Sequence, residues 1–225
     1  MALAFAAAGA NVVVTSRDID ACRAVAAEVE ALGVEAFAYA CHVGKWNELD
    51  DLVDTAYQRF GQVDVLVNNA GKSPTYSALV DVTESMYDSV LGLNLKGPFR
   101  LGVLVGTRMF DGHGGTIINV SSTASLHPRP DMVPYAAAKA GLNATTIALA
   151  HAFAPKVRVN AIVPGGFRTD ISKHWTPELA EALASQAALG RVGEPHEIVG
   201  AAVYLASDAS TFTTGALLTV DGGIA

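Results

Sequence analysis

The residues from Thr116 to Lys139 decide the fold. They read Thr116-Ile-Ile-Asn-Val120, then Ser121-Ser122, a proline-rich loop, and Pro134-Tyr135-Ala-Ala-Ala-Lys139. The β-branched run predicts a strand. Pro134 opens an alanine-rich segment, and the fixed φ of proline suits the first turn of a helix. A strand that leads through a loop into a helix is the repeating unit of α/β proteins.

The same alternation runs along the whole chain. The expected strands are 12–15, 34–41, 63–67, 116–120, 157–163 and 217–220. The expected helices are 1–8, 18–32, 45–60, 83–110 (interrupted near Gly97-Pro98), 134–153, 177–188 and 194–206. These spacings suit crossover connections and predict an α/β fold with a doubly wound parallel sheet, Rossmann-like, in three layers. No linker or repeat is visible, so we expect residues 1–225 to form a single domain.

The composition is that of a globular protein. Hydrophobic residues make up 51% and charged residues 16%, with a net charge of −7. No basic stripe occurs and no apolar stretch reaches the length of a membrane span, so we expect neither nucleic acid nor membrane as a partner. Cys22 and Cys41 lack metal or redox spacing, and no other cluster has it. We therefore expect no bound metal. We also expect both cysteines to be reduced thiols and the protein to be cytoplasmic.

Tyr135 and Lys139 lie four residues apart and share one face of the predicted helix. An ammonium group beside a phenol favours phenolate and lowers the tyrosine pKa, which makes the pair suitable for proton transfer. Alone, Tyr-x-x-x-Lys is common on helix surfaces. The pattern indicates a catalytic pair only if the chain also supplies a cofactor site and a carbonyl pocket.

Small and polar residues follow five of the predicted strands. They are Ser16-Arg17, His42-Val43, Asn68 to Gly71, Ser121-Ser122 and Pro164 to Gly166. In doubly wound folds, ligands bind where the carboxyl ends of the strands open into a crevice. A single glycine after a strand is equally well an ordinary turn residue. Together these residues predict a backbone-lined groove for a flat ligand.

Several motifs in register resemble the classical short-chain dehydrogenase/reductases, over essentially all of residues 1–225. They are Asn68-Asn69-Ala70-Gly71, Asn94 of Asn-Leu-Lys-Gly97, Ser122, Tyr135-x-x-x-Lys139, Val163-Pro164-Gly165 with Thr169, and Val220-Asp221-Gly222-Gly223. The resemblance implies an oxidoreductase that transfers a hydride between NADP(H) and a carbonyl or secondary alcohol. A 3-oxoacyl thioester is one candidate for that small-molecule substrate.

The resemblance also implies roles for single residues. Tyr135 would be the general acid/base, Lys139 would lower its pKa and bind the nicotinamide ribose, and Ser122 would hold the substrate oxygen. Asn94 would anchor a water that links Lys139 to solvent, and it could also bond backbone at a helix bend. The implied cofactor contacts are Ser16, Arg17, Val43, Asn69, Ala70, Gly71, Tyr135, Lys139, Pro164, Gly165, Phe167 and Thr169.

Ser16 and Arg17 stand where NAD-dependent relatives usually carry a carboxylate. A hydroxyl and a guanidinium group suit a 2′-phosphate, so we expect NADP as the cofactor, with NAD as the alternative. Asp18, one residue later, is interpreted as a helix cap. His42-Val43 stands where the family usually has Asp-Val at the adenine edge.

The chain departs from the family pattern at its start. The family's first strand and glycine-rich turn would lie upstream of Met1. That strand is normally central, beside residues 12–15, so its loss should leave two neighbouring strands without hydrogen-bond partners. Either Met1 is internal to a longer protein, which we favour, or a truncated form exists with a gap or a repaired sheet.

The substrate pocket and the assembly are expectations of the same kind. Residues 170–190 resemble the family's mobile substrate lid, with 73–76 and 126–132 as further walls. Apolar residues on more than one face of the helices at 83–110 and 134–153 predict a homotetramer or homodimer. Two alternatives to the NADP(H)-dependent enzyme stay open. One is an NAD-dependent sugar or secondary-alcohol dehydrogenase, and the other is a non-catalytic interaction or regulatory protein.

Overall fold

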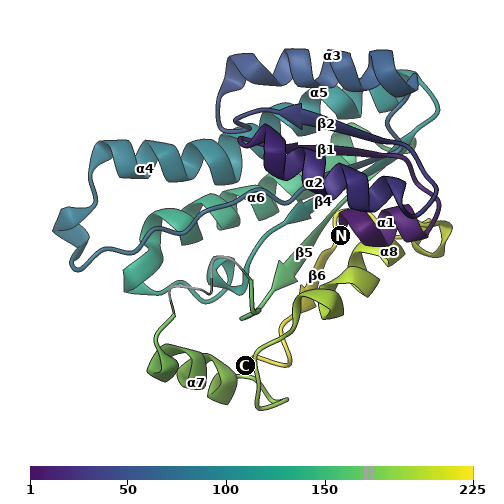
Figure 1. The fold of residues 1–225 in the computed structure, drawn as a ribbon. Coiled ribbons are helices and arrows are strands. Elements are labelled where there is room, and N and C mark those ends of the chain that lie inside the picture. The colour runs from purple at the N-terminus through teal and green to yellow at the C-terminus, as the bar shows by residue number, and fades with distance from the viewer. Residues whose placement is uncertain (170–171, 173–174, 225) are drawn as a thin grey trace.

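The structure, a computed structural model, describes residues 1–169, 172 and 175–224. All of its strand pairs are parallel, and strands alternate with helices (Figure 1). The strands are β1 (Val12–Ser16), β2 (Ala36–Ala40), β3 (Val65–Asn68), β4 (Gly115–Val120), β5 (Val157–Pro164) and β6 (Leu217–Val220). The α-helices are α1 (Ala2–Ala7), α2 (Ile19–Glu30), α3 (Leu49–Phe60), α4 (Glu84–Leu91), α5 (Gly97–Asp111), α6 (Val133–Ala152), α7 (Pro177–Gln186) and α8 (Val199–Ala206). The predicted α/β, Rossmann-like class is confirmed.

Helices cover both faces of the strands (Figure 1). On one face α3, α5 and α6 pack around Leu101, Ile117 and Leu149. On the other face α1 and α8 pack around Ile118 and Leu205. Because successive side chains of a strand point to opposite faces, Ile117 and Ile118 enter different cores. Because β4 buries Ile117 on one face and Ile118 on the other, it requires the three-layer arrangement.

The strands form two hydrogen-bonded groups. One contains β1 and β2, and the other contains β3, β4, β5 and β6 in that order. Within the described part of the chain, β1 and β3 each pair on one side only, so each has an edge whose backbone groups lack a ladder partner. The prediction that two strands each lack a hydrogen-bond partner on one side is confirmed.

The helix expected over 83–110 is interrupted one turn earlier than predicted. A π-helical turn, Gly92–Lys96, separates α4 from α5. Pro98 has no N–H to donate to the carbonyl of Asn94, so the α-helical ladder cannot run unbroken through this point. Gly97 serves another purpose: a methyl group there would lie 2.0 Å from Val43 O, so only glycine lets α5 approach this loop.

Two other predicted helices begin later than expected. The 3₁₀ turns Trp46–Glu48 and Pro195–Ile198 precede α3 and α8. Such turns are common at helix N-termini, where the first N–H groups have no intrahelical acceptor. Among the helices of residues 1–169, 172 and 175–224, none has both the length and the apolar character needed to cross a membrane.

Candidate active site

The carboxyl ends of β3, β4 and β5 lie at one edge of the four-stranded group, because these strands are parallel and paired in register. Asn69 and Ala70 follow β3 and are exposed. Ser122 follows β4, and Pro164 ends β5. Ser16 and Arg17, at the end of β1, belong to the separate two-stranded group.

Ser122 is held by the turn that it begins. Its backbone is extended, and its hydroxyl accepts the N–H of Ala124 at 3.2 Å as the cap of the 3₁₀ turn Thr123–Ser125. The side chain of Ser122 also acts on the phenol of Tyr135, whose pKa it lowers. The strand end and the helix start therefore bring the two predicted residues together.

Tyr135 lies in the first turn of α6. Burial raises the pKa of its phenol, and the contact with Ser122 acts in the opposite direction. The net shift is upward, opposite to the lowered tyrosine pKa that was expected, because the cost of desolvating phenolate outweighs the contact with Ser122. The Lys139 ammonium group is nevertheless close, with Nζ 5.7 Å from the centre of the tyrosine ring.

Lys139 is buried one helical turn beyond Tyr135, with 3% of its surface exposed. Its Nζ donates to Val120 O, at the end of β4, at 2.7 Å. Burial lowers the pKa of the Lys139 ammonium group to about 8. Taking a charge out of water disfavours the charged form, so this lysine can lose its proton near neutral pH.

Asn94 is fully buried in the π-helical turn. Its Nδ2 donates to Val90 O and Lys72 O, both at 2.9 Å, and its Oδ1 accepts the Lys72 N–H at 3.2 Å. A methyl group added at Gly71 would lie 2.8 Å from Asn94 Oδ1 and 3.6 Å from Lys139 Nζ. These three residues therefore meet beyond β3. The prediction that Asn94 bonds backbone at a helix bend is confirmed, and its water relay stays a prediction.

Asp18 caps the helix after β1. Its Oδ1 accepts the N–H groups of Asp20 at 2.9 Å and Ala21 at 3.2 Å, which confirms the interpretation of Asp18 as a cap. The hydroxyl of Ser16 accepts the Asp18 N–H at 3.1 Å. Arg17 lies between them and is exposed.

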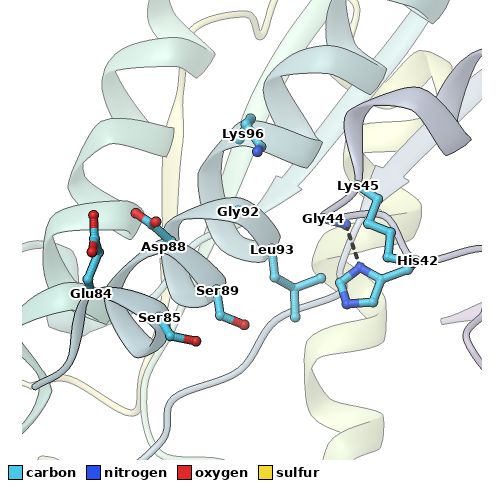
Figure 2. A pocket seen from close by; sticks show the side chains of 10 residues that line it. All are labelled: His42, Gly44, Lys45, Glu84, Ser85, Asp88, Ser89, Gly92, Leu93 and Lys96. Atoms are coloured by element: carbon cyan, nitrogen blue, oxygen red, sulfur yellow. Dashed lines mark hydrogen bonds between the residues drawn. The ribbon is translucent and has the colours of Figure 1, made fainter.

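The loop after β2 borders a separate pocket of about 540 Å³, shown in Figure 2. His42 Nδ1 accepts the N–H of Gly44 at 3.1 Å, while Val43 is buried in the core. The pocket is lined by His42, Gly44 and Lys45 of this loop and by α4 with the π-helical turn, including Glu84, Asp88 and Lys96. Its lining leaves out Ser122, Tyr135 and Lys139, so it is not the centre of the chemistry.

The remaining predicted site residues follow β5. Gly165 donates its N–H to Val220 O at 3.0 Å, and the ring of Phe167 packs against Gly193. Thr169 is exposed. Residues 170, 171, 173 and 174 of the expected lid lie outside the described residues. In the rest of the chain, no group of three or more His, Cys, Asp or Glu side chains could hold a metal ion.

Two residues beside this site, and one contact of Tyr76 from the expected pocket wall, were not predicted. Asn143 is buried one turn after Lys139, and a polar residue at that spacing in an alanine-rich helix was the available signal. Its partner Ser125 lies in the Ser122 turn. Tyr76 donates to Pro130 O at 2.8 Å, a contact across 54 positions for which the sequence carries no signal.

Comparison with known proteins agrees with this architecture. A family model described as enoyl-(acyl carrier protein) reductase matches residues 1–225. The 3-oxoacyl-(acyl-carrier-protein) reductase FabG of Thermotoga maritima is 34% identical over 223 residues, 99% of this chain and 90% of that protein. A short-chain type dehydrogenase/reductase from Mycobacterium marinum has a TM-score of 0.90 at 34% identity, over 99% of this chain and 89% of that chain. A 7α-hydroxysteroid dehydrogenase, solved with NADH and 7-oxo glycochenodeoxycholic acid, has a TM-score of 0.93 at 35% identity, over 99% and 87%.

Parallel strands, a serine after β4, and a tyrosine with a buried lysine on α6 define an α/β oxidoreductase. Sequence similarity over 99% of the chain then identifies the family. The chain belongs to the short-chain dehydrogenase/reductase family. Its class is that of the NAD(P)-dependent oxidoreductases that act on CH–OH groups.

Proposed function

We propose that the protein transfers a hydride between NADP(H) and a carbonyl or secondary-alcohol substrate. One observation carries the proposal: Ser122, which follows β4, acts on the Tyr135 phenol of α6 and lowers its pKa, and Lys139 Nζ lies 5.7 Å from the centre of the tyrosine ring. Two neighbouring hydroxyl groups can hold one carbonyl oxygen and give it a proton.

Each of these side chains has a role in the proposed reaction. In reduction the Tyr135 hydroxyl donates its proton to the carbonyl oxygen, and in oxidation the phenolate takes a proton from the alcohol. Ser122 holds the same oxygen, and Lys139 holds the nicotinamide ribose and exchanges protons with the phenol. Asn94 anchors the water that connects Lys139 to solvent. NADP(H), when bound, supplies or accepts the hydride.

The described residues fit such a cofactor. Gly71 packs so closely against Asn94 that a methyl group would lie 2.8 Å from Asn94 Oδ1 and 3.6 Å from Lys139 Nζ. The Gly71 backbone therefore borders both side chains, and a ribose held by Lys139 would lie beside it. The adenine edge would be held by Val43, the adenosine ribose by Asn69, Ala70 and Gly71, and the nicotinamide end by Pro164, Gly165, Phe167 and Thr169.

The choice of NADP is supported by the residues after β1. Asp18 Oδ1 accepts two N–H groups of α2, which favours a capping role for Asp18 over one in binding ribose hydroxyls. Arg17 is exposed, so its guanidinium group can bind a 2′-phosphate, and the Ser16 hydroxyl, which donates to Asp18 O at 2.9 Å, would have to turn to join it. We expect kcat/KM for NADPH to exceed that for NADH, and Arg17→Glu to reverse the preference. A wild-type preference for NADH would favour the NAD-dependent sugar or secondary-alcohol dehydrogenase instead.

A 3-oxoacyl thioester is the substrate that we propose first, because FabG of Thermotoga maritima, 34% identical, bears that activity in its name. A panel of 3-oxoacyl thioesters, oxosteroids and ketoses would be assayed with NADPH, with Tyr135→Phe as the control. Loss of the acid/base should cost about a hundredfold or more in kcat. Full activity in that variant would refute the mechanism. A folded sample that does not bind NADPH in a fluorescence titration would favour the non-catalytic alternative.

We further propose one domain over residues 1–225, a homodimer or homotetramer, and a cytoplasmic location. Tyr87, Phe99 and Ile147 are exposed by 43%, 41% and 42% on α4, α5 and α6. Exposed apolar side chains on helices of one face are typical of subunit interfaces. Cys22 and Cys41 are free thiols, which suits a reducing compartment. Light scattering of wild type and Phe99→Asp would test the assembly, and a monomeric wild type would contradict it.

A further inference from the structure

A polar side chain on α6 lies behind the turn that carries Ser122. Asn143 is four residues beyond Lys139, so it lies on the same side of the helix. It is buried, with 7% of its surface exposed. Its Nδ2 donates to the hydroxyl of Ser125 at 2.8 Å. Asn143 therefore contacts the catalytic turn from a helix that also carries Tyr135.

Ser125 connects Asn143 to Ser122 through a second hydrogen bond. It is the last residue of the 3₁₀ turn Thr123–Ser125, and its hydroxyl donates to Ser122 O at 2.6 Å. A serine hydroxyl has one proton to donate. Since that proton goes to Ser122, Ser125 can only accept from Asn143, and an amide N–H can only donate. The two hydrogen bonds are thus directional and mutually consistent.

The other end of the Asn143 amide supports a role beyond packing. Its Oδ1 is buried and has no hydrogen-bond partner among the described residues. A buried carbonyl oxygen without a partner lowers stability. A leucine of similar length would avoid that cost, so stability does not explain an asparagine at this position. What the asparagine provides is the N–H donor to Ser125.

We propose that Asn143 is a positioning residue that, through Ser125, fixes the backbone of Ser122 and thereby aims the Ser122 hydroxyl at Tyr135. This rests on the proposed function, in which that hydroxyl holds the substrate oxygen. Ser122 has three hydrogen bonds in the turn: its carbonyl accepts the Ser125 N–H at 3.0 Å and the Ser125 hydroxyl at 2.6 Å, and its hydroxyl accepts the Ala124 N–H. Asn143 of the helix orients the Ser125 hydroxyl that makes the second of them.

The direction of the hydrogen bonds makes the proposal testable with variants of one position. Asn143→Asp keeps the shape but replaces the donor with an acceptor, so Ser125 turns its proton toward the carboxylate and releases Ser122. Asn143→Leu removes the donor but leaves Ser125 free to keep its bond to Ser122. We expect kcat to fall about tenfold or more in the aspartate variant and only a few-fold in the leucine variant, because small misplacements of a catalytic group are costly.

Variants at Ser125 and a matched control complete the design. Ser125→Ala should lower kcat without changing the NADPH dissociation constant, and Ser125→Thr, which keeps the hydroxyl, should restore it. Thr146→Val removes another buried hydroxyl of α6, one that bonds Asn119 and Leu142 rather than the Ser122 turn. It should lower the melting temperature but leave kcat unchanged. Equal kcat losses in Asn143→Leu and Asn143→Asp, or in Ser125→Ala and Thr146→Val, would overturn the proposal.

A second measurement does not depend on turnover. The contact with Ser122 acts to lower the pKa of Tyr135. Ultraviolet titration of the phenol, with Tyr135→Phe as the blank, should therefore give a higher midpoint in Ser125→Ala than in wild type or Thr146→Val. The charged group that faces this phenol, Lys139, is unchanged in all three. A shifted midpoint in a protein that reduces no carbonyl would refute the proposed function and leave the positioning role intact. An unshifted midpoint would refute the positioning role.

Discussion

Lys139 is a proposed site residue whose pKa is changed by burial. Its ammonium group is 3% exposed and has the Val120 carbonyl as its partner, so most of its hydration is lost on folding. Its pKa falls from the ordinary 10.5 to about 8. A lowered lysine pKa means that the charged form is less favourable in the folded than in the unfolded chain.

Replacement of Lys139 by Met should reveal this cost as a function of pH. Between pH 8 and pH 10.5 the unfolded wild type binds more protons than the folded one, so its stability rises with pH. The free energy of unfolding of wild type relative to Lys139→Met should therefore rise across this window, by about 3 kcal/mol at most. Loss of the hydrogen bond to Val120 changes this difference in free energy by the same amount at every pH, so it does not affect the rise with pH. Urea denaturation of both proteins at several pH values tests this, and parallel pH curves would contradict it.

Gly71 provides a steric test at the same scale. Gly71→Ala would place a methyl group 2.8 Å from Asn94 Oδ1, so the amide or the loop must move. We expect kcat/KM to fall about tenfold or more. Gly200→Ala is the control: its site in α8 is open within 4 Å, and alanine there should stabilise the helix by up to about 1 kcal/mol. Similar kinetics of the two variants would show that the Gly71 contact is not tight.

At the scale of elements, Tyr76 joins the two loops that were expected to form pocket walls. Its hydroxyl donates to Pro130 O and accepts the Val133 N–H, both at 2.8 Å. Val133 is the first residue of α6, so Tyr76 also caps a free N–H of the catalytic helix. One side chain thus connects the loop after β3 with the loop before α6.

Tyr76→Phe should loosen this connection without changing the side-chain volume much. We expect the KM for the carbonyl substrate to rise and the free energy of unfolding to fall by about 1 kcal/mol, since the hydrogen bonds are partly exposed. Affinity for NADPH should not change. Tyr204→Phe removes a comparable hydroxyl, bonded to Thr213 at 3.0 Å and distant in sequence from both loops, and should leave KM unchanged. A rise in KM in both variants would contradict the assignment of Tyr76 to the pocket.

At the scale of the whole molecule, the division of the sheet is the dominant feature. The ladder bonds of β1 to β2 use Val12 N–H and Ser16 O, and those of β3 to β4 use Asp64 O. In parallel strands, alternate residues bond to the same neighbour. The N–H groups of Val13 and Val65 therefore point to the open edges.

Hydrogen exchange of the 225-residue chain should report this division. The amides of Val13 and Val65 should exchange faster than those of their neighbours Val14 and Leu66, which point into a ladder, because unpaired backbone groups open more easily. Ile117 and Ile118 of the central β4 are the protected reference. Equal protection of Val13 and Val14 would mean that another segment covers the edge of β1.

The sequence by itself determined the features that depend on neighbouring residues. β-Branched runs and capping residues act locally, so the strands, the Asp18 cap and the α/β class could be predicted. The catalytic pair could be proposed for the same reason, since four residues on a helix define one face. Parallel pairing then brings Ser122 and Pro164 to one edge.

Only the tertiary structure decided the features that depend on contacts between distant segments. The meeting of Gly71 with Asn94, the bond from Asn143 to Ser125, and the link from Tyr76 to Pro130 each join separate elements. The direction of the Tyr135 pKa shift belongs here too, because desolvation is set by the surrounding chain and outweighs the contact with Ser122. Spacing shows which side chains share a helix face, and packing decides how much water and which partners reach them.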